Sequence, residues 1–296
     1  MSDRRISRRK FLKLSTAALA VTTVGFQLPS RSRLVVERHT LSLPRWSADG
    51  FKIAFLSDFH LDDEGAATRS IHAIELAAAE KPDVIAFGGD FVSGRSELGS
   101  FPLVEKVFKR LADTGITSVG VPGNHDYWQS SEQIQTLFET TTKAGLKLLR
   151  NQHIEFQGIV INGIDDGFNR LDRHDSLPRR FDKNILTLFH EPDFVTRIDK
   201  RASLMLAGHS HGGQICLPFG LKVHTPVGAR DYWSGFYESA TVPLYVSRGV
   251  GTVGPDLRAF GPPEVSILTL KSSSSKYSET QPGDSPIEAK QNRPKS

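Results

Sequence analysis

Short apolar runs alternate with amphipathic segments along the first half of the chain. The predicted strands are residues 51–56, 83–87 and 116–121, and the predicted helices are residues 68–80, 102–111 and 131–144. Strands that alternate with helices form βαβ units. This half of the chain therefore predicts an α/β fold with a largely parallel sheet.

The second half of the chain is richer in strand-like segments. The predicted strands are residues 154–156, 159–164, 185–189, 204–207, 244–247 and 265–270. Only residues 192–198 read as a helix among them. Two sheets packed together account for this pattern better than one sheet does.

Polar residues of a few kinds follow five of the predicted strands directly. The carboxyl ends of strands form the ligand-binding edge of an α/β sheet, so we expect these side chains to meet. Oxygen and imidazole donors without a thiolate suit Mn, Fe, Zn, Co or Ni. The segments are Ser57-Asp58-Phe59-His60, Gly88-Gly89-Asp90, Gly123-Asn124-His125-Asp126, Phe189-His190-Glu191 and Gly208-His209-Ser210-His211-Gly212-Gly213.

The order D-x-H, G-D, G-N-H-D, a lone His and G-H-x-H resembles the signature of the calcineurin-like metallophosphoesterases. The resemblance covers roughly residues 51–270 and includes every segment. It implies a four-layer αββα sandwich with a dinuclear metal site at the carboxyl ends of the strands. It also implies hydrolysis of a phosphate ester by a hydroxide that two divalent metal ions activate.

The resemblance assigns a role to each matching residue. The metal ligands would be Asp58, His60 and His211 for one ion, Asn124, His190 and His209 for the other, and Asp90 as the bridge between them. The catalytic pair would be His125 and Asp126. His125 would bind the phosphoryl oxygen or protonate the leaving group, and Asp126 would orient His125 and favour its protonated form.

Other residues extend this hypothesis toward the substrate. Arg95, Arg248 and Arg258 are candidates for gripping an anionic group, with a surface role as the alternative. Aromatic side chains either pack in the core or form an apolar rim suited to a lipid or nucleoside; they are Tyr127, Trp128, Trp233 and Phe236. We expect Asp165 and Asp166 to be solvated loop acids and Cys216 to be a small buried side chain.

Composition and charge narrow the possible functions. The chain of 296 residues is 38% hydrophobic and 24% charged, which excludes a disordered chain and a protein with many membrane spans. Its single cysteine excludes an internal disulfide framework. Residues 1–33 carry a net charge of +7 and residues 271–296 carry +2, which leaves −5 for residues 34–270. The acidic body argues against a nucleic-acid substrate, although the pI is 9.1.

The basic N-terminal segment reads as an export address. Residues 7–13 read Ser-Arg-Arg-Lys-Phe-Leu-Lys, and a weakly apolar stretch follows over residues 14–26. The segment resembles the twin-arginine (Tat) signal of proteins exported already folded. We therefore expect recognition by the Tat translocase and a location in the periplasm, in the cell wall or on the outer face of the cytoplasmic membrane.

The expected domains are a Tat-type signal or membrane anchor over residues 1–33, a catalytic domain over 34–270 and a disordered tail over 271–296. The leading hypothesis is an exported metal-dependent phosphodiesterase acting on a small or lipid-linked ester, such as an envelope lipid or cell-wall component. Two enzymatic alternatives are a phosphomonoesterase and a hydrolase of the UDP-2,3-diacylglucosamine type. A catalytically silent metal-binding protein of the envelope is the alternative outside enzymes.

Overall fold

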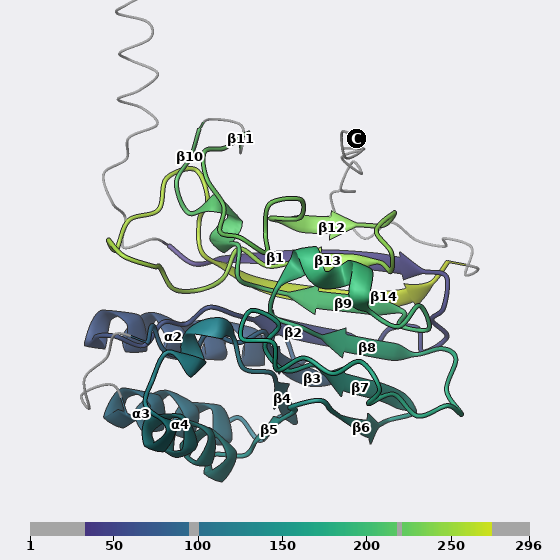
Figure 1. Ribbon diagram of the computed structural model, residues 1–296, viewed down its shortest axis with the longest axis horizontal. Coiled ribbons are helices and arrows are strands. Elements are labelled where there is room, and N and C mark those ends of the chain that lie inside the picture. Colours follow the sequence, from purple (N-terminus) through teal and green to yellow (C-terminus); the bar gives the residue numbers. More distant parts are fainter. Residues whose placement is uncertain (1–32, 95–100, 218–220, 274–296) are drawn as a thin grey trace, which may run out of the picture.

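Two six-stranded mixed sheets form the centre of the molecule (Figure 1). The computed structural model describes residues 33–94, 101–217 and 221–273. The first sheet has the order β1 (Val35–Leu43), β14 (Glu264–Ser272), β2 (Lys52–Leu56), β3 (Val84–Phe87), β4 (Ser118–Gly120) and β5 (Leu146–Leu148). The second has the order β12 (Gly235–Tyr237), β13 (Leu244–Val246), β9 (Leu204–Ala207), β8 (Ile185–Leu188), β7 (Ile159–Gly163) and β6 (Gln152–Phe156).

Apolar side chains hold these sheets together in layers. Ile53 and Phe55 of β2 face the second sheet and pack in one cluster with Leu186 of β8. Ala54 and Leu56, the alternate residues of β2, pack in another cluster with the helices. Because both faces of β2 are covered, its sequence is a continuous apolar run, as parallel strands require.

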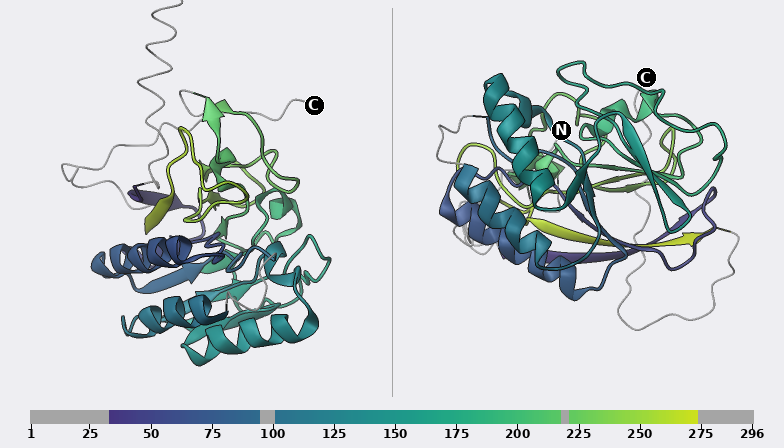
Figure 2. Two further views of the ribbon diagram at one scale, coloured as in Figure 1. Left: turned by 90° about the vertical axis from the view of Figure 1, so that its left-hand side faces the viewer. Right: turned by 90° about the horizontal axis from the view of Figure 1, so that it is seen from below.

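Three helices cover the outer face of the first sheet, as the two views of Figure 2 show. They are α2 (Glu64–Ala79), α3 (Phe101–Ala112) and α4 (Ser131–Lys143). Loops and the 3₁₀ helix η3 (Pro192–Arg197) contribute the apolar side chains that cover the second sheet. The predicted layer order is therefore confirmed, with short 3₁₀ structure where residues 192–198 predicted a helix.

The structure adds elements that the apolar pattern did not predict. Strand β1 pairs in parallel with β14 along its whole length, and β14 continues to Ser272, past the boundary expected at residue 270. A small antiparallel pair of strands, β10 (Cys216–Leu217) and β11 (Leu221–Lys222), follows the loop after β9. Helix α2 begins at Glu64, earlier than expected, because Asp63 caps it by accepting from the Ala66 amide.

Strand direction brings the predicted polar segments to one edge of the molecule. Strands β2, β3 and β4 run parallel to one another, and so do β7, β8 and β9. We call the edge formed by the carboxyl ends of β2, β3, β4, β8 and β9 the ligand edge. Strand β14 is antiparallel to β2, so β14 and its parallel neighbour β1 both begin at the ligand edge.

Several predictions fall outside the described residues. These are the export signal before Arg33, Arg95, and the tail beyond residue 273. Among the helices of the described part of the chain, none has the length and apolar character needed to cross a membrane.

Candidate metal centre

Five of the acidic and imidazole residues at the ligand edge have positive backbone φ angles. The φ angles are 56° at Asp58, 47° at His60, 57° at Asp90, 66° at His209 and 50° at His211. Residues with a Cβ atom rarely adopt this left-handed region, and such strained residues cluster at functional sites. The chain thus bends sharply after β2, β3 and β9 at residues that carry these polar side chains.

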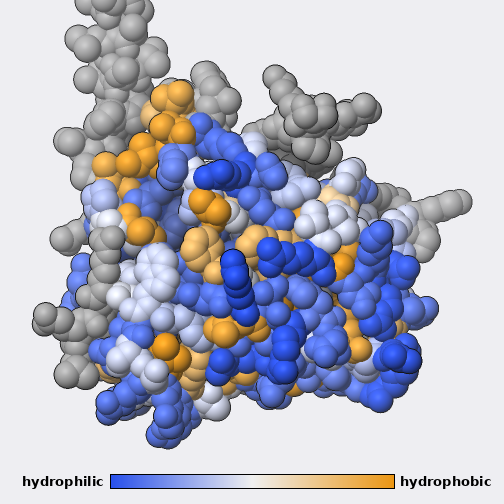
Figure 3. Space-filling model, viewed as in Figure 1, coloured by the Kyte–Doolittle hydropathy of each residue, from blue (hydrophilic) through white to orange (hydrophobic). Residues whose placement is uncertain are grey.

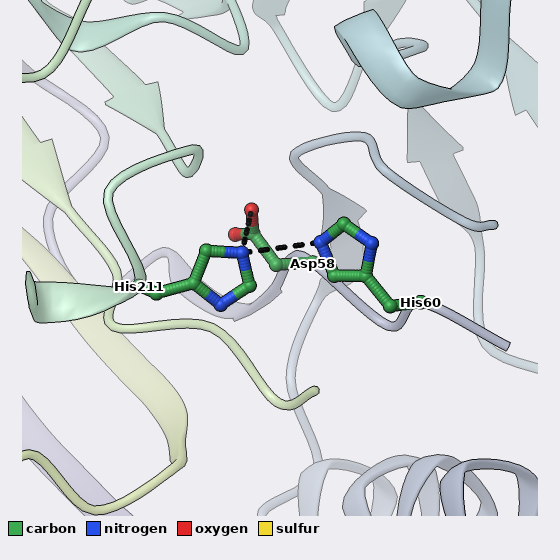
Figure 4. Close-up of side chains that lie close together, drawn as sticks. All are labelled: Asp58, His60 and His211. Carbon is green, nitrogen blue, oxygen red and sulfur yellow. Dashed lines mark hydrogen bonds and ion pairs between the residues drawn. The ribbon is translucent and has the colours of Figure 1, made fainter. Parts of the chain in front are cut away.

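The first candidate site consists of Asp58 and His60, from the loop after β2, and His211, from the loop after β9 (Figure 4). The Nε2 atoms of the two histidines are 3.1 Å apart, and His211 Nε2 lies 3.5 Å from Asp58 Oδ1. All three side chains are buried. Two donors bound to one ion at about 2.1 Å lie about 3.0–3.4 Å from each other, so this spacing fits a shared divalent cation.

The second candidate site consists of Asp90, His190 and His209. His190 donates from Nδ1 to the Gly88 carbonyl at 2.6 Å, which turns its Nε2 toward Asp90 Oδ2 at 3.1 Å. His209 donates from Nε2 to the Val227 carbonyl at 2.8 Å, which leaves Nδ1 as its ligand atom. Carbonyl partners of this kind fix the tautomer and orientation of metal-binding histidines.

Asp90 lies between the two sites. Its Oδ2 is 3.1 Å from His190 Nε2 and 3.6 Å from His60 Nε2, so one carboxylate oxygen faces an imidazole of each site. Its Oδ1 accepts a hydrogen bond from the His125 amide at 2.9 Å. This is the position that the expected bridging role requires.

Two buried atoms here have no hydrogen-bond partner, namely Asn124 Oδ1 and His190 Nε2. Buried polar atoms in folded proteins are nearly always paired, so two unpartnered atoms among the acidic and imidazole groups of these sites indicate a place for a cation. The donor set contains carboxylate, amide and imidazole groups, which suits borderline divalent ions. The residues present therefore fit two metal ions.

Burial favours the neutral form of three of the imidazoles by lowering their pKa values. It lowers the pKa of His60 to about 3 and that of His209 to about 4, and it lowers the pKa of His211 as well. Neutral imidazole is the form that binds metal. Burial acts in the same direction on His190, but the adjacent Asp90 outweighs it and raises the pKa of His190 above its ordinary value.

His125 lies beside these sites without belonging to either. Its ring centroid is 4.9 Å from that of His60 and 3.9 Å from that of Trp128, and the side chain is half-buried. Its Nδ1 donates to the Ser93 carbonyl at 2.9 Å. The Nε2 atom is therefore the nitrogen available for chemistry.

The contacts of Asp126 differ from those expected. Its carboxylate accepts four backbone hydrogen bonds, from the amides of Asp90, Phe91, Val92 and Gly123, at 2.8–3.1 Å. Burial and the neighbouring Asp90 raise its pKa to about 8, while these amides act in the opposite direction. The orientation of His125 comes from the Ser93 carbonyl, and Asp126 instead ties together the two loops that carry Asp90 and Asn124.

Of the three arginines expected to grip the substrate, the two that the structure describes are engaged elsewhere. Arg248 pairs with Glu37 at 2.7 Å and with Glu264 at 3.0 Å. Arg258 is 7% exposed and donates to backbone carbonyls, including those of His211 and Gly249. Both side chains therefore support the loops of the ligand edge, and neither offers a free guanidinium to an anion.

Two acids that were expected in solvent are buried. Asp165 accepts from the Tyr127 hydroxyl and from Arg150 Nε, and Asp166 accepts from the Asn169 amide at 2.7 Å. They follow β7, whose carboxyl end lies beside that of β8. The rule that placed the ligands at strand ends applies to these acids too, and it is the signal that could have identified them. Cys216 is buried, as expected.

Similar proteins match this chain over most of its length. The metallophosphoesterase YkuE of Bacillus subtilis is 30% identical over 286 residues, which is 91% of this chain and 99% of YkuE. The phosphodiesterase YaeI of Escherichia coli is 34% identical over 280 residues, which is 90% of this chain and 99% of YaeI. A solved dimetal phosphatase from Danio rerio aligns over 75% of this chain and 93% of its own, with 12% identity and a TM-score of 0.48.

Residues 51–226 match the family described as calcineurin-like phosphoesterase. This match spans both candidate sites, His125 and all five strand ends that carry the ligand residues. The chain therefore belongs to the calcineurin-like phosphoesterases, metal-dependent hydrolases of phosphate esters that use a dinuclear site of divalent ions.

Proposed function

We propose that this protein is an exported phosphodiesterase that depends on two metal ions and acts in the cell envelope. The observation that carries the proposal is the position of His125, which lies against a paired set of buried ligand residues and keeps Nε2 free. A protein that only stored metal would not need such a group. The pairing thus favours catalysis over the silent metal-binding alternative.

The metal ligands in this proposal are Asp58, His60, Asp90, Asn124, His190, His209 and His211. When bound, two divalent ions would supply an activated hydroxide and neutralise charge on the phosphoryl oxygens. The chain's own residues orient the ester: His125 Nε2 binds a phosphoryl oxygen or gives a proton to the departing alkoxide. The Ser93 carbonyl holds this ring in place by accepting from Nδ1.

Support for a diester comes from the relative named phosphodiesterase, YaeI, which aligns with nearly the whole chain. Support for export comes from the twin arginine and the apolar stretch that follows it in residues 7–26. The proposed partners are accordingly the Tat translocase and a small or lipid-linked phosphate ester. The net charge of −5 over residues 34–270 disfavours nucleic acid.

The test of this function uses the full chain with its metals restored. We expect hydrolysis of bis-p-nitrophenyl phosphate faster than that of p-nitrophenyl phosphate on one preparation. His125→Ala should reduce turnover by about a hundredfold or more, because a positioned general acid contributes that much. Its metal content, measured on the same sample, should match that of the wild type.

The matched control is His72→Ala, which removes an exposed histidine from α2 and should leave turnover unchanged. If the fully metallated wild type cleaves neither ester, the proposed enzymatic activity is refuted. Full turnover by the His125→Ala variant would refute the role given to His125. Faster hydrolysis of p-nitrophenyl phosphate than of the diester would favour a phosphomonoesterase over a phosphodiesterase.

A further inference from the structure

Exposed hydrophobic side chains gather at the ligand edge. Among the described residues, the exposed large hydrophobics are Trp128, Phe168, Leu171, Ile215, Leu217, Val223, Val227 and Phe260. Trp128 stacks against His125, and the ring centroid of Phe168 is 6.3 Å from that of His209. We call the five aliphatic and aromatic residues on the other side of the site, Ile215, Leu217, Val223, Val227 and Phe260, the apolar lip.

The apolar lip is built on the loops that hold the ligands. The Val227 carbonyl accepts from the imidazole of His209, and Ile215 follows His211 and forms an isolated bridge with Ala259, next to Phe260. Figure 3 shows hydrophobic residues grouped over β10, β11 and the loop that precedes β14. The lip therefore stands at a fixed position beside the metal centre.

The lip has the chemistry of a lipid-facing surface. Leu217 is 54% exposed and Val223 is 62% exposed, although soluble proteins generally keep contiguous apolar patches small. Lys222 precedes Val223 and places its Nζ 4.0 Å from the centre of the Trp233 ring, and the exposed Arg230 is followed by the exposed Asp231. Tryptophan and lysine side chains beside exposed aliphatic ones are typical of segments that enter the membrane interface.

The described chain begins at the same edge. Strand β1 begins at the ligand edge, where the Val35 amide donates to the Pro263 carbonyl at 3.0 Å. The residues before it include the apolar stretch 14–26, which lies outside the described part of the chain. Because β1 starts only a few residues after that stretch, a chain held to a membrane by it would keep its ligand edge close to the lipid.

We infer that the apolar lip docks on the surface of a lipid bilayer. Docking brings the metal centre to phosphate esters at the level of the lipid headgroups. This second statement rests on the proposed function and narrows its substrate to esters carried by membrane lipids, whereas the docking itself does not depend on hydrolysis.

Sedimentation with vesicles of phosphatidylethanolamine and phosphatidylglycerol tests the docking. We expect the full chain to bind, and the double variant Leu217→Asp with Val223→Asp to lose affinity by roughly tenfold or more, because it removes apolar area and adds charge that lipid repels. The control is Gln135→Asp with Thr142→Asp, which adds the same charge at exposed positions of α4. Equal binding by the two double variants would overturn the proposal.

A second measurement separates the lip from the N-terminal stretch. An environment-sensitive dye on Val223→Cys should shift to the blue when vesicles are added, and the same dye on Thr142→Cys should not. Wild type treated with the dye gives the background of the buried Cys216. A blue-shifted Val223→Cys signal before vesicles are added would mean that the chain's own apolar segment or a second copy covers the lip, and it would overturn the inference.

The substrate statement is tested with phosphatidylglycerol, itself a phosphodiester, in the same vesicles. We expect the lip variant to show a lower ratio of lipid turnover to turnover of soluble bis-p-nitrophenyl phosphate than the α4 control. Loss of soluble turnover in the wild type would count against the proposed function. An unchanged ratio with soluble turnover present would count against the lipid substrate alone.

Discussion

At the scale of single residues, Asp126 is the position where sequence and structure differ most informatively. Its two carboxylate oxygens accept hydrogen bonds from four backbone amides in the loops that follow β3 and β4. One of these amides belongs to Asp90 and another to Gly123, which precedes Asn124. Asp126 thus fixes the spacing of two ligand residues through backbone hydrogen bonds.

We predict that Asp126→Asn destabilises the protein by about 2–4 kcal/mol. The amide group of asparagine would place a donor against two backbone donors and leave buried N–H groups unpaired. Urea unfolding of the chelated protein should show the loss. Unchanged stability with reduced turnover would instead mean that Asp126 acts through His125, as the sequence predicts.

The identities of the ligands were accessible from sequence, but their supporting partners were not. Asp58, His60 and Asp90 stand out because a polar residue directly follows an apolar strand. The partners of His125 and Asp126 are backbone groups, which every residue carries, so no letter in the sequence marks them. For the same reason the sequence does not show that Arg248 pairs with Glu264 or that Arg258 donates to backbone carbonyls, which excludes the substrate-gripping role considered for both.

At the scale of elements, close approach between the loops after β2 and β9 sets the first site. A Cβ atom at Gly208 would lie 1.9 Å from Ser57 Oγ and 2.6 Å from Asp58 Oδ2. The amide of the next residue, His209, donates to Asp58 Oδ1 at 3.0 Å. The two loops can hold one ion between them only because no side chain intervenes.

Gly208→Ala should therefore push the β9 loop away from β2 and weaken metal binding at the first site by about tenfold or more, since overpacking typically costs about 1–3 kcal/mol. Gly261→Ala is the control, because its nearest new contact would be 3.7 Å away. Titration with Mn²⁺ followed by calorimetry compares the two. Equal affinities would show that the loops adapt without cost.

Strand β1 shows what the apolar pattern cannot detect. Residues 35–43 include Glu37, Arg38 and His39, and most of the strand is half-buried because it lies at the edge of the first sheet. An edge strand needs no continuous apolar run, so its sequence resembles that of a loop. The buried strands β2, β3, β8 and β9 have no polar outer face, and their sequences predicted them closely.

At the scale of the whole molecule, each candidate metal site joins the two sheets. The first combines Asp58 and His60 from the first sheet with His211 from the second, and the second combines Asp90 from the first with His190 and His209 from the second. An ion bound to either set favours the packed sandwich over its separated halves. Metal binding is therefore coupled to folding of the body.

We predict that chelation lowers the melting temperature by about 5–10 °C. A ligand present at about a hundred times its dissociation constant adds about 2.7 kcal/mol, and each kcal/mol shifts a domain of this size by about 2–4 °C. Differential scanning calorimetry with and without EDTA measures the shift. The His60→Ala variant should show a smaller difference, and an equal one would mean that the first site adds no stability.

The left-handed backbone at Asp58, His60, Asp90, His209 and His211 lowers the stability of the metal-free chain. Such conformations cost on the order of 1 kcal/mol or more at each residue that has a Cβ atom, and glycine adopts them freely. Selection for a stable fold alone would erode these positions toward glycine or asparagine. Metal binding and hydrolysis both require an acid or imidazole there, so a substitution that stabilises the metal-free chain at these positions would weaken the metal-bound, active form.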